Sequence, residues 1–253
     1  MKKKQWVTLL FVEAFLISNI IIKATNEMCI LFMFINFQLI INLTAWRIKD
    51  TIFSNADWLR RAVYFIPYIT AILFFSPNST FDTSISRFVV SMVVAVLFGL
   101  LLLIPRFGEI KPFFNKELAF FFPPISFSKA CMETFSLFSS AIIQELFYKL
   151  FVIGLLISQF GIVLSLFISA FLFVADHLIH ARAAMFRPID YLAQLILSIC
   201  AGMLYVYSGS VLTAILLHLT YNLPLALSYL YRYWVINTAG KEKKVRKVGG
   251  GNA

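Results

Sequence analysis

Ionisable side chains are scarce within the apolar runs of this sequence, and they gather in three of those runs. Glu145 and Lys149 share one run, Asp176 and His177 lie in the next, and His218 lies in the last. A charged group at the centre of a bilayer costs roughly 2.5 to 3.5 kcal/mol on insertion scales, so a residue of this kind in a membrane span is a candidate for function. Carboxylates and imidazoles can transfer protons or bind a metal ion. We therefore expect these runs to build a polar site.

The spacing of these residues places several of them on shared helix faces. Residues four apart on a helix are neighbours, so Glu145 lies beside Lys149 and His218 beside Asn222. An ion pair between Glu145 and Lys149 would offset part of the cost of burying each charge. His177 and His218 are deep in separate runs, which favours a shared site over isolated core histidines. Three further ionisable residues are expected to make helix contacts or to lie at the membrane interface: Glu13, Glu133 and His180.

The elements that would position this site are membrane-spanning helices. The chain has 253 residues, of which 60% are apolar and only 13% charged, and its mean hydropathy is +0.85. Soluble domains are about half apolar and about a quarter charged. The composition therefore excludes a soluble enzyme and a disordered chain, and it predicts an all-α integral membrane protein with a single domain, residues 1–253. The net charge of +10 is assigned to membrane topology and not to a nucleic-acid partner.

We predict a bundle of about eight transmembrane helices, because a helix needs about 20 residues to cross a bilayer. The apolar runs cover residues 6–22, 28–46, 62–75, 85–104, 132–157, 160–179, 191–207 and 211–230. With eight passes, nineteen of the 22 lysines and arginines fall on the side that holds both termini. Cytoplasmic flanks are enriched in these residues, so both termini are predicted to be cytoplasmic. The basic segment 241–253 is predicted to be a flexible tail that meets anionic lipid. The location is the cell membrane, or an endomembrane in a eukaryotic host.

Three motifs in the second half of the chain occur in a recognisable order. They are Gln144-Glu145-x-x-x-Lys149, Phe173-x-x-x-His177 and His218-x-x-x-Asn222. This arrangement resembles the Glu-Glu-x-x-x-Arg, Phe-x-x-x-His and His-x-x-x-Asn pattern of the CAAX protease and bacteriocin-processing family of intramembrane endopeptidases. The resemblance covers residues 132–230. It implies a buried site that activates water to cleave a peptide or the terminus of a membrane protein.

The resemblance also implies a role for each matching residue. His177 would help to activate the water, and His218 with Asn222 would stabilise the developing oxyanion. Glu145 would orient the site by pairing with Lys149, which stands where the family has arginine. A lysine offers a point charge in place of a planar fork.

Gln144 departs from the family pattern, because it occupies the place of the water-activating glutamate. An amide can hold a water molecule but cannot accept its proton. One reading is a non-catalytic scaffold or immunity factor of the same fold, a pseudoenzyme. In a second reading Glu145 turns inward as the base. In a third, His177, His218 and Glu145 bind a divalent metal such as zinc, the alternative being a site without metal.

A transporter or proton pathway is a further function class for the same buried polar groups. The chain shows no obvious inverted repeat, a feature of many secondary transporters. The motifs therefore favour the endopeptidase, acting on prenylated CAAX termini or on a secreted peptide such as a bacteriocin according to the host.

Overall fold

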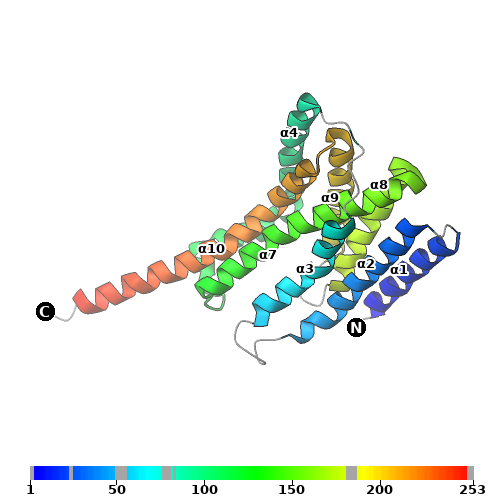
Figure 1. The fold of residues 1–253 in the computed structure, drawn as a ribbon. Coiled ribbons are helices and arrows are strands. Elements are labelled where there is room, and N and C mark those ends of the chain that lie inside the picture. Colours follow the sequence, from blue (N-terminus) through cyan, green and yellow to red (C-terminus); the bar gives the residue numbers. More distant parts are fainter. Residues whose placement is uncertain are drawn as a thin grey trace.

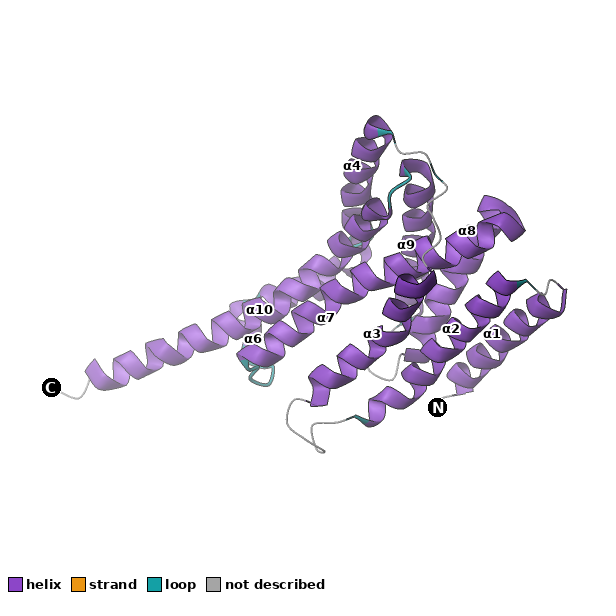
Figure 2. Ribbon diagram, viewed as in Figure 1, coloured by secondary structure: helices purple, strands orange, loops and turns teal. Residues whose placement is uncertain are grey.

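The computed structural model describes residues 3–22, 25–48, 56–75, 81, 84–180 and 187–249. Within these ranges the chain is helical and contains no strand, as Figure 2 shows. This confirms the predicted all-α fold class.

The helices follow one another in a simple order along the chain. The long elements are α1 (Lys3–Ile22), α2 (Asn26–Thr44), α3 (Ala56–Phe75), α4 (Ile85–Leu101), α7 (Phe127–Glu145), η4 (Leu146–Ile153), α8 (Gly154–His180), α9 (Pro188–Ser208) and α10 (Val211–Gly249). A short helix, η1 (Ala45–Arg47), follows α2. Four short helices connect α4 to α7: η2 (Ile104–Arg106), α5 (Phe107–Ile110), η3 (Lys111–Phe114) and α6 (Lys116–Ala119).

Six helical segments of the described chain are long and apolar enough to cross a membrane. One of them, Phe127–Ile179, has 53 residues and contains two passes. The passes are separated at Gly161, whose φ of 70° is a left-handed conformation that glycine adopts without a steric penalty. A shorter apolar helix, Gln5–Ile21, lies in α1. The described helices therefore make the chain a multi-pass membrane protein. The number of eight passes and the cytoplasmic placement of both termini stay predictions.

The last helix is longer than the sequence analysis predicted. We placed the end of the last span at residue 230 and a flexible tail from 241, whereas α10 continues as one helix to Gly249. Figure 1 shows this helix extending beyond the rest of the bundle toward the C-terminus. Pro224 lies inside the helix and does not end it.

Local sequence signals set several helix boundaries. The Ser126 hydroxyl caps the start of α7 by accepting a hydrogen bond from the Lys129 backbone N–H. Pro188 is the first residue of α9, where its missing N–H is not needed. Gly209 ends α9 with a φ of 69°, the left-handed conformation common after a helix.

The core of the bundle surrounds the π-helical segment η4. Phe147 and Phe151 are fully buried there and stack on each other, with ring centroids 5.1 Å apart. Tyr68 of α3 packs edge-on against Phe147. Short π-helical stretches inside α-helices are frequent at functional sites. Here the π-helical stretch begins directly after Glu145 and contains Lys149, so the first motif lies in the core.

The helices that carry the three motifs meet around this core. Figure 1 shows α1, α2 and α3 side by side, with α8 behind them, and α7 running along α10. The last helix also packs against α4 and α9, and α9 packs against α8. Residues of α7, α8 and α10 are therefore brought to one place.

Candidate active site

A cavity of about 410 Å³ opens between the helices that carry the motifs. Its wall includes four of the six residues that the sequence analysis selected: Gln144, His177, His218 and Asn222. The other two, Glu145 and Lys149, are fully buried and do not line the cavity. The fold thus brings all six residues into one region. Four of them line the cavity, and Glu145 and Lys149 are buried away from it.

His177 is oriented by the backbone of its own helix. Its Nδ1 lies 2.8 Å from the carbonyl oxygen of Phe173, and a carbonyl can only accept a hydrogen bond. The proton therefore sits on Nδ1, and in the neutral ring Nε2 carries the lone pair. This is the protonation pattern that a general base requires at Nε2.

Phe173 explains the aromatic residue of the second motif. Its ring is fully buried, and its centroid lies 4.5 Å from that of His177 and 5.8 Å from that of His218. One phenylalanine therefore contacts both histidine rings and keeps them on the same side of the cavity.

His218 is held from behind by a carboxylate. Its Nδ1 lies 2.8 Å from Oε1 of Glu145, and both side chains are buried. A carboxylate on one ring nitrogen fixes the orientation of an imidazole and leaves the other nitrogen for a reacting group. Because Glu145 has this task and does not line the cavity, the geometry does not support its alternative role as an inward-facing base.

The predicted ion pair between Glu145 and Lys149 is present but loose. Nζ of Lys149 lies 4.0 Å from Oε2 of Glu145, and its hydrogen bond, at 2.6 Å, goes to the hydroxyl of Ser198 on α9. Oε2 of Glu145 accepts no hydrogen bond from the described residues. The closest partner of Glu145 is therefore His218, whereas the sequence analysis assigned Lys149 to it. The lysine reaches across to α9 instead.

Asn222 and Gln144 contribute amide groups to the cavity wall. The Asn222 amide nitrogen donates to the carbonyl oxygen of Leu137 at 3.2 Å. An amide nitrogen carries two hydrogens, so one remains for a ligand. Gln144 lies on the cavity wall near the end of α7. The residue that departs from the family pattern thus faces the cavity, where it could hold a water molecule.

The geometry does not fit the metal alternative. Among the described residues, no three histidine, cysteine, aspartate or glutamate side chains are grouped closely enough to hold a metal ion. Oε1 of Glu145 is already hydrogen-bonded to Nδ1 of His218. No step of the chemistry is therefore assigned to a metal.

Beside His177 lies a buried carboxylate network. Asp176 accepts hydrogen bonds from the hydroxyl of Tyr68, at 2.6 Å, and from the amide of Asn42. Asn42 in turn accepts from Gln38. The sequence analysis singled out Asp176 but missed its partners on α2 and α3. The spacing of Gln38 and Asn42, four apart in an apolar run, was the signal for a polar helix face.

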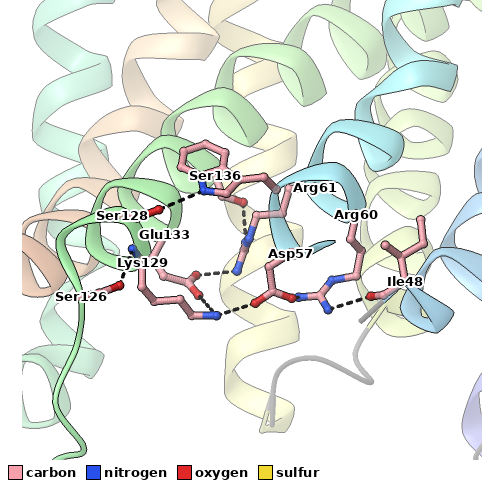
Figure 3. A network of polar contacts seen from close by, with 10 residues as sticks. Ile48, Asp57, Arg60, Arg61, Ser126, Ser128, Lys129, Glu133 and Ser136 are labelled. Carbon is pink, nitrogen blue, oxygen red and sulfur yellow. Dashed lines mark hydrogen bonds and ion pairs between the residues drawn. The ribbon is translucent and has the colours of Figure 1, made fainter. Parts of the chain in front are cut away.

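Ion pairs tie α3 to α7 at one end of the cavity (Figure 3). Glu133 accepts from Arg61 at 2.7 Å, and Asp57 pairs with both Arg60 and Lys129 at 2.6 Å. Arg60, Arg61 and Glu133 also line the cavity. Glu133, which was expected to be an anchor at the membrane interface, thus also joins α7 to α3 through Arg61.

Glu13 and His180 were also expected to make helix contacts or to lie at the membrane interface. Glu13 of α1 accepts a long hydrogen bond, 3.5 Å, from Asn36 of α2, which fits the expected helix contact. The side chain of His180 lies outside the described residues.

The comparison with protein families matches the part of the chain that carries the three motifs. Residues 126–224 match the family described as Rce1-like, type II CAAX prenyl endopeptidase Rce1-like. No curated protein and no solved structure matches the chain. The matched segment runs from the start of α7 into α10 and includes the residues of all three motifs.

Proposed function

We propose, from the CAAX protease family pattern of residues 126–224, that this multi-pass membrane protein is an intramembrane endopeptidase. Its substrate class is a peptide or the terminus of a membrane protein. One observation carries the proposal: His177, His218 and Asn222 line the same cavity, each with its outer contact already fixed by another group.

His177 is proposed to accept the proton of the attacking water. The bond from Nδ1 to the Phe173 carbonyl leaves the lone pair of the neutral ring on Nε2. Gln144 holds the water through its amide oxygen, a task that needs no proton transfer to the glutamine. The water oxygen then forms a bond to the carbonyl carbon of the scissile peptide, and the carbonyl oxygen becomes negative.

His218 and Asn222 are proposed to stabilise that oxygen. Donation from Nε2 of His218, while Nδ1 donates to Glu145, requires the imidazolium, whose charge the Glu145 carboxylate balances. The second amide hydrogen of Asn222 is the other donor. When the carbon–nitrogen bond breaks, His177 returns its proton to the leaving amine. Products are a new carboxyl terminus and a new amino terminus.

Gln144 supports a second candidate, a non-catalytic member of the same fold that binds a peptide or a partner helix. In this case the cavity and its polar wall remain, but Gln144 can only hold the water and cannot accept its proton. The two candidates differ in what His177→Ala does to the peptides of the host cell.

The test compares membrane and secreted peptides from cells that carry the wild type, His177→Ala or Gln144→Glu. The endopeptidase predicts peptide ends that are present with the wild type and lost with His177→Ala. If wild type and His177→Ala give the same ends, and Gln144→Glu creates new ones, the chain is a binding protein that has lost its base. Equal detergent-extracted levels of the three proteins serve as the control for folding.

A further inference from the structure

A second group of polar residues lines the cavity on the face of α9, apart from the three motifs. Asp190 and Gln194 are four residues apart on this helix, so they share one face. Both line the cavity and are about 95% buried, with exposed fractions of 4% and 5%. Neither belongs to the motifs from which the proposed chemistry was argued.

The amide oxygen of Gln194, Oε1, is buried and has no hydrogen-bond donor in the described part of the chain. A buried polar group that lacks a hydrogen bond loses roughly 1 to 3 kcal/mol relative to a satisfied one, so native proteins rarely leave one empty. Because Gln194 lines the cavity, we expect a ligand in the cavity to donate the missing hydrogen bond to its amide oxygen.

Asp190 and Arg106 add one acceptor and one donor beside Gln194. Asp190 uses Oδ2 to accept the backbone N–H of Arg187 and cap α9, while Oδ1 accepts no hydrogen bond. Nε of Arg106 lies 3.5 Å from that Oδ1 and likewise makes no hydrogen bond among the described residues. The pair is close enough to attract but too far apart to satisfy both atoms.

This cluster adjoins the proposed oxyanion site. Arg106 donates from Nη1 to the hydroxyl of Tyr221 at 3.1 Å, and Tyr221 directly precedes Asn222 on α10. Arg106, Tyr221 and Asn222 line the same cavity as Asp190 and Gln194. A ligand that reaches Asn222 can therefore extend along α9.

The chemistry of the cluster matches a peptide main chain. The Gln194 amide can both accept and donate hydrogen bonds, as a peptide group does. Asp190 adds a second acceptor and Arg106 a second donor. A phosphodiester group would pair with Arg106 but carries no hydrogens to donate to Oδ1 of Asp190 or Oε1 of Gln194. A peptide brings N–H donors for both acceptors and a carbonyl for the arginine.

We infer that Gln194, with Asp190 and Arg106, binds the main chain of the peptide beside the scissile bond. The inference rests on the proposed function, since it assigns a subsite to that substrate. Gln194 is a binding residue in this account and takes no part in water activation.

The experiment measures peptide binding separately from cleavage. Purified protein in detergent is incubated with a pool of random-sequence acetylated decapeptides, half of which carry a farnesylated cysteine fourth from the C-terminus. Peptides retained by the protein are separated by gel filtration and quantified by mass spectrometry. All proteins carry His177→Ala, so that bound peptides are not consumed.

Gln194→Leu is compared with Gln194→Met, which keeps the length of the side chain without the amide. Gln159→Leu, the same substitution outside the cavity wall, is the matched control. We expect retention to fall about five- to tenfold in both Gln194 variants and to be unchanged in the control, with all melting temperatures close to that of the parent.

Equal retention by Gln194→Leu and the parent would overturn the inference, as would a parent that retains no peptide of the pool. Retention that depends on Gln194, in a protein whose wild type cleaves nothing, would support the subsite and refute the endopeptidase. The two proposals therefore fail separately.

Discussion

The closest approach between α4 and α10 provides a quantitative test of how the fold positions the site. A methyl group added at Gly99 would lie 2.7 Å from Cβ of Thr220 and 3.0 Å from the carbonyl oxygen of Leu217. Ordinary contacts begin at 3.4 Å, so Gly99→Ala must push α10 away by about 0.7 Å. Thr220 cannot rotate away cheaply, because its hydroxyl bonds to the Leu216 carbonyl and its Cβ is fixed to the backbone.

The displaced segment of α10 carries both His218 and Asn222. Overpacking costs about 1 to 3 kcal/mol, and the better helix propensity of alanine returns about 1 kcal/mol. We therefore expect a net loss of up to about 2 kcal/mol in the free energy of unfolding. Because an error of about 1 Å in a reacting group can reduce a rate about a hundredfold, peptide cleavage should fall at least tenfold.

The assay is thermal unfolding of the purified protein together with cleavage of the peptide pool described above. Gly108→Ala is the matched control, because a methyl group there meets no atom within 4 Å. Gly202→Ala should be intermediate, since the atom it meets at 2.6 Å is the end of the flexible Leu166 side chain. If Gly99→Ala matches Gly108→Ala in both stability and cleavage, the proposed coupling of α4 packing to the site is wrong.

Three other changes test the polar interior. Glu145→Gln removes the carboxylate shared by His218 and the buried Lys149 ammonium, so thermal melting should report a loss of about 3 to 5 kcal/mol. Adding Lys149→Met removes the uncompensated ammonium and should restore part of this loss; a double variant no better than the single would contradict the ion pair. Tyr68→Phe removes the donor to Asp176 and should cost about 1.5 to 3 kcal/mol by the same measurement; an unchanged melting temperature would contradict this hydrogen bond. Lys129→Ala, with a side chain 44% exposed, should cost less than about 1 kcal/mol, and less still in high salt; a larger loss would show that the ion pairs between α3 and α7 are strongly coupled.

The helices, and the residues that line the candidate site, could be predicted from the sequence because both depend on strong local signals. Long apolar runs leave few structural choices in a membrane, since every backbone group must be hydrogen-bonded within its own segment. Residues four apart on such a helix share a face, which brought His218 and Asn222 together correctly. Histidines within apolar runs then indicated where the helices meet.

The partners of those residues could not be predicted, because they come from helices distant in sequence. The contact of Glu145 with His218 depends on the packing of α7 against α10, and spacing along one helix favoured Lys149 instead. The π-helical segment after Glu145 and the unbroken length of α10 left no recognisable periodic signal either. Gln194 was missed because a single glutamine in an apolar run becomes informative only when the cavity beside it is known.

Cleavage of the peptide pool in water enriched with oxygen-18 tests the central claim most directly. Water activated at His177 should place one labelled oxygen in each new carboxyl terminus. We predict labelled termini with the purified wild type, a rate at least about a hundredfold lower with His177→Ala, and a rate at least equal to that of the wild type with Gln144→Glu. No labelled termini with the wild type, or equal labelling with His177→Ala, would contradict the proposed endopeptidase.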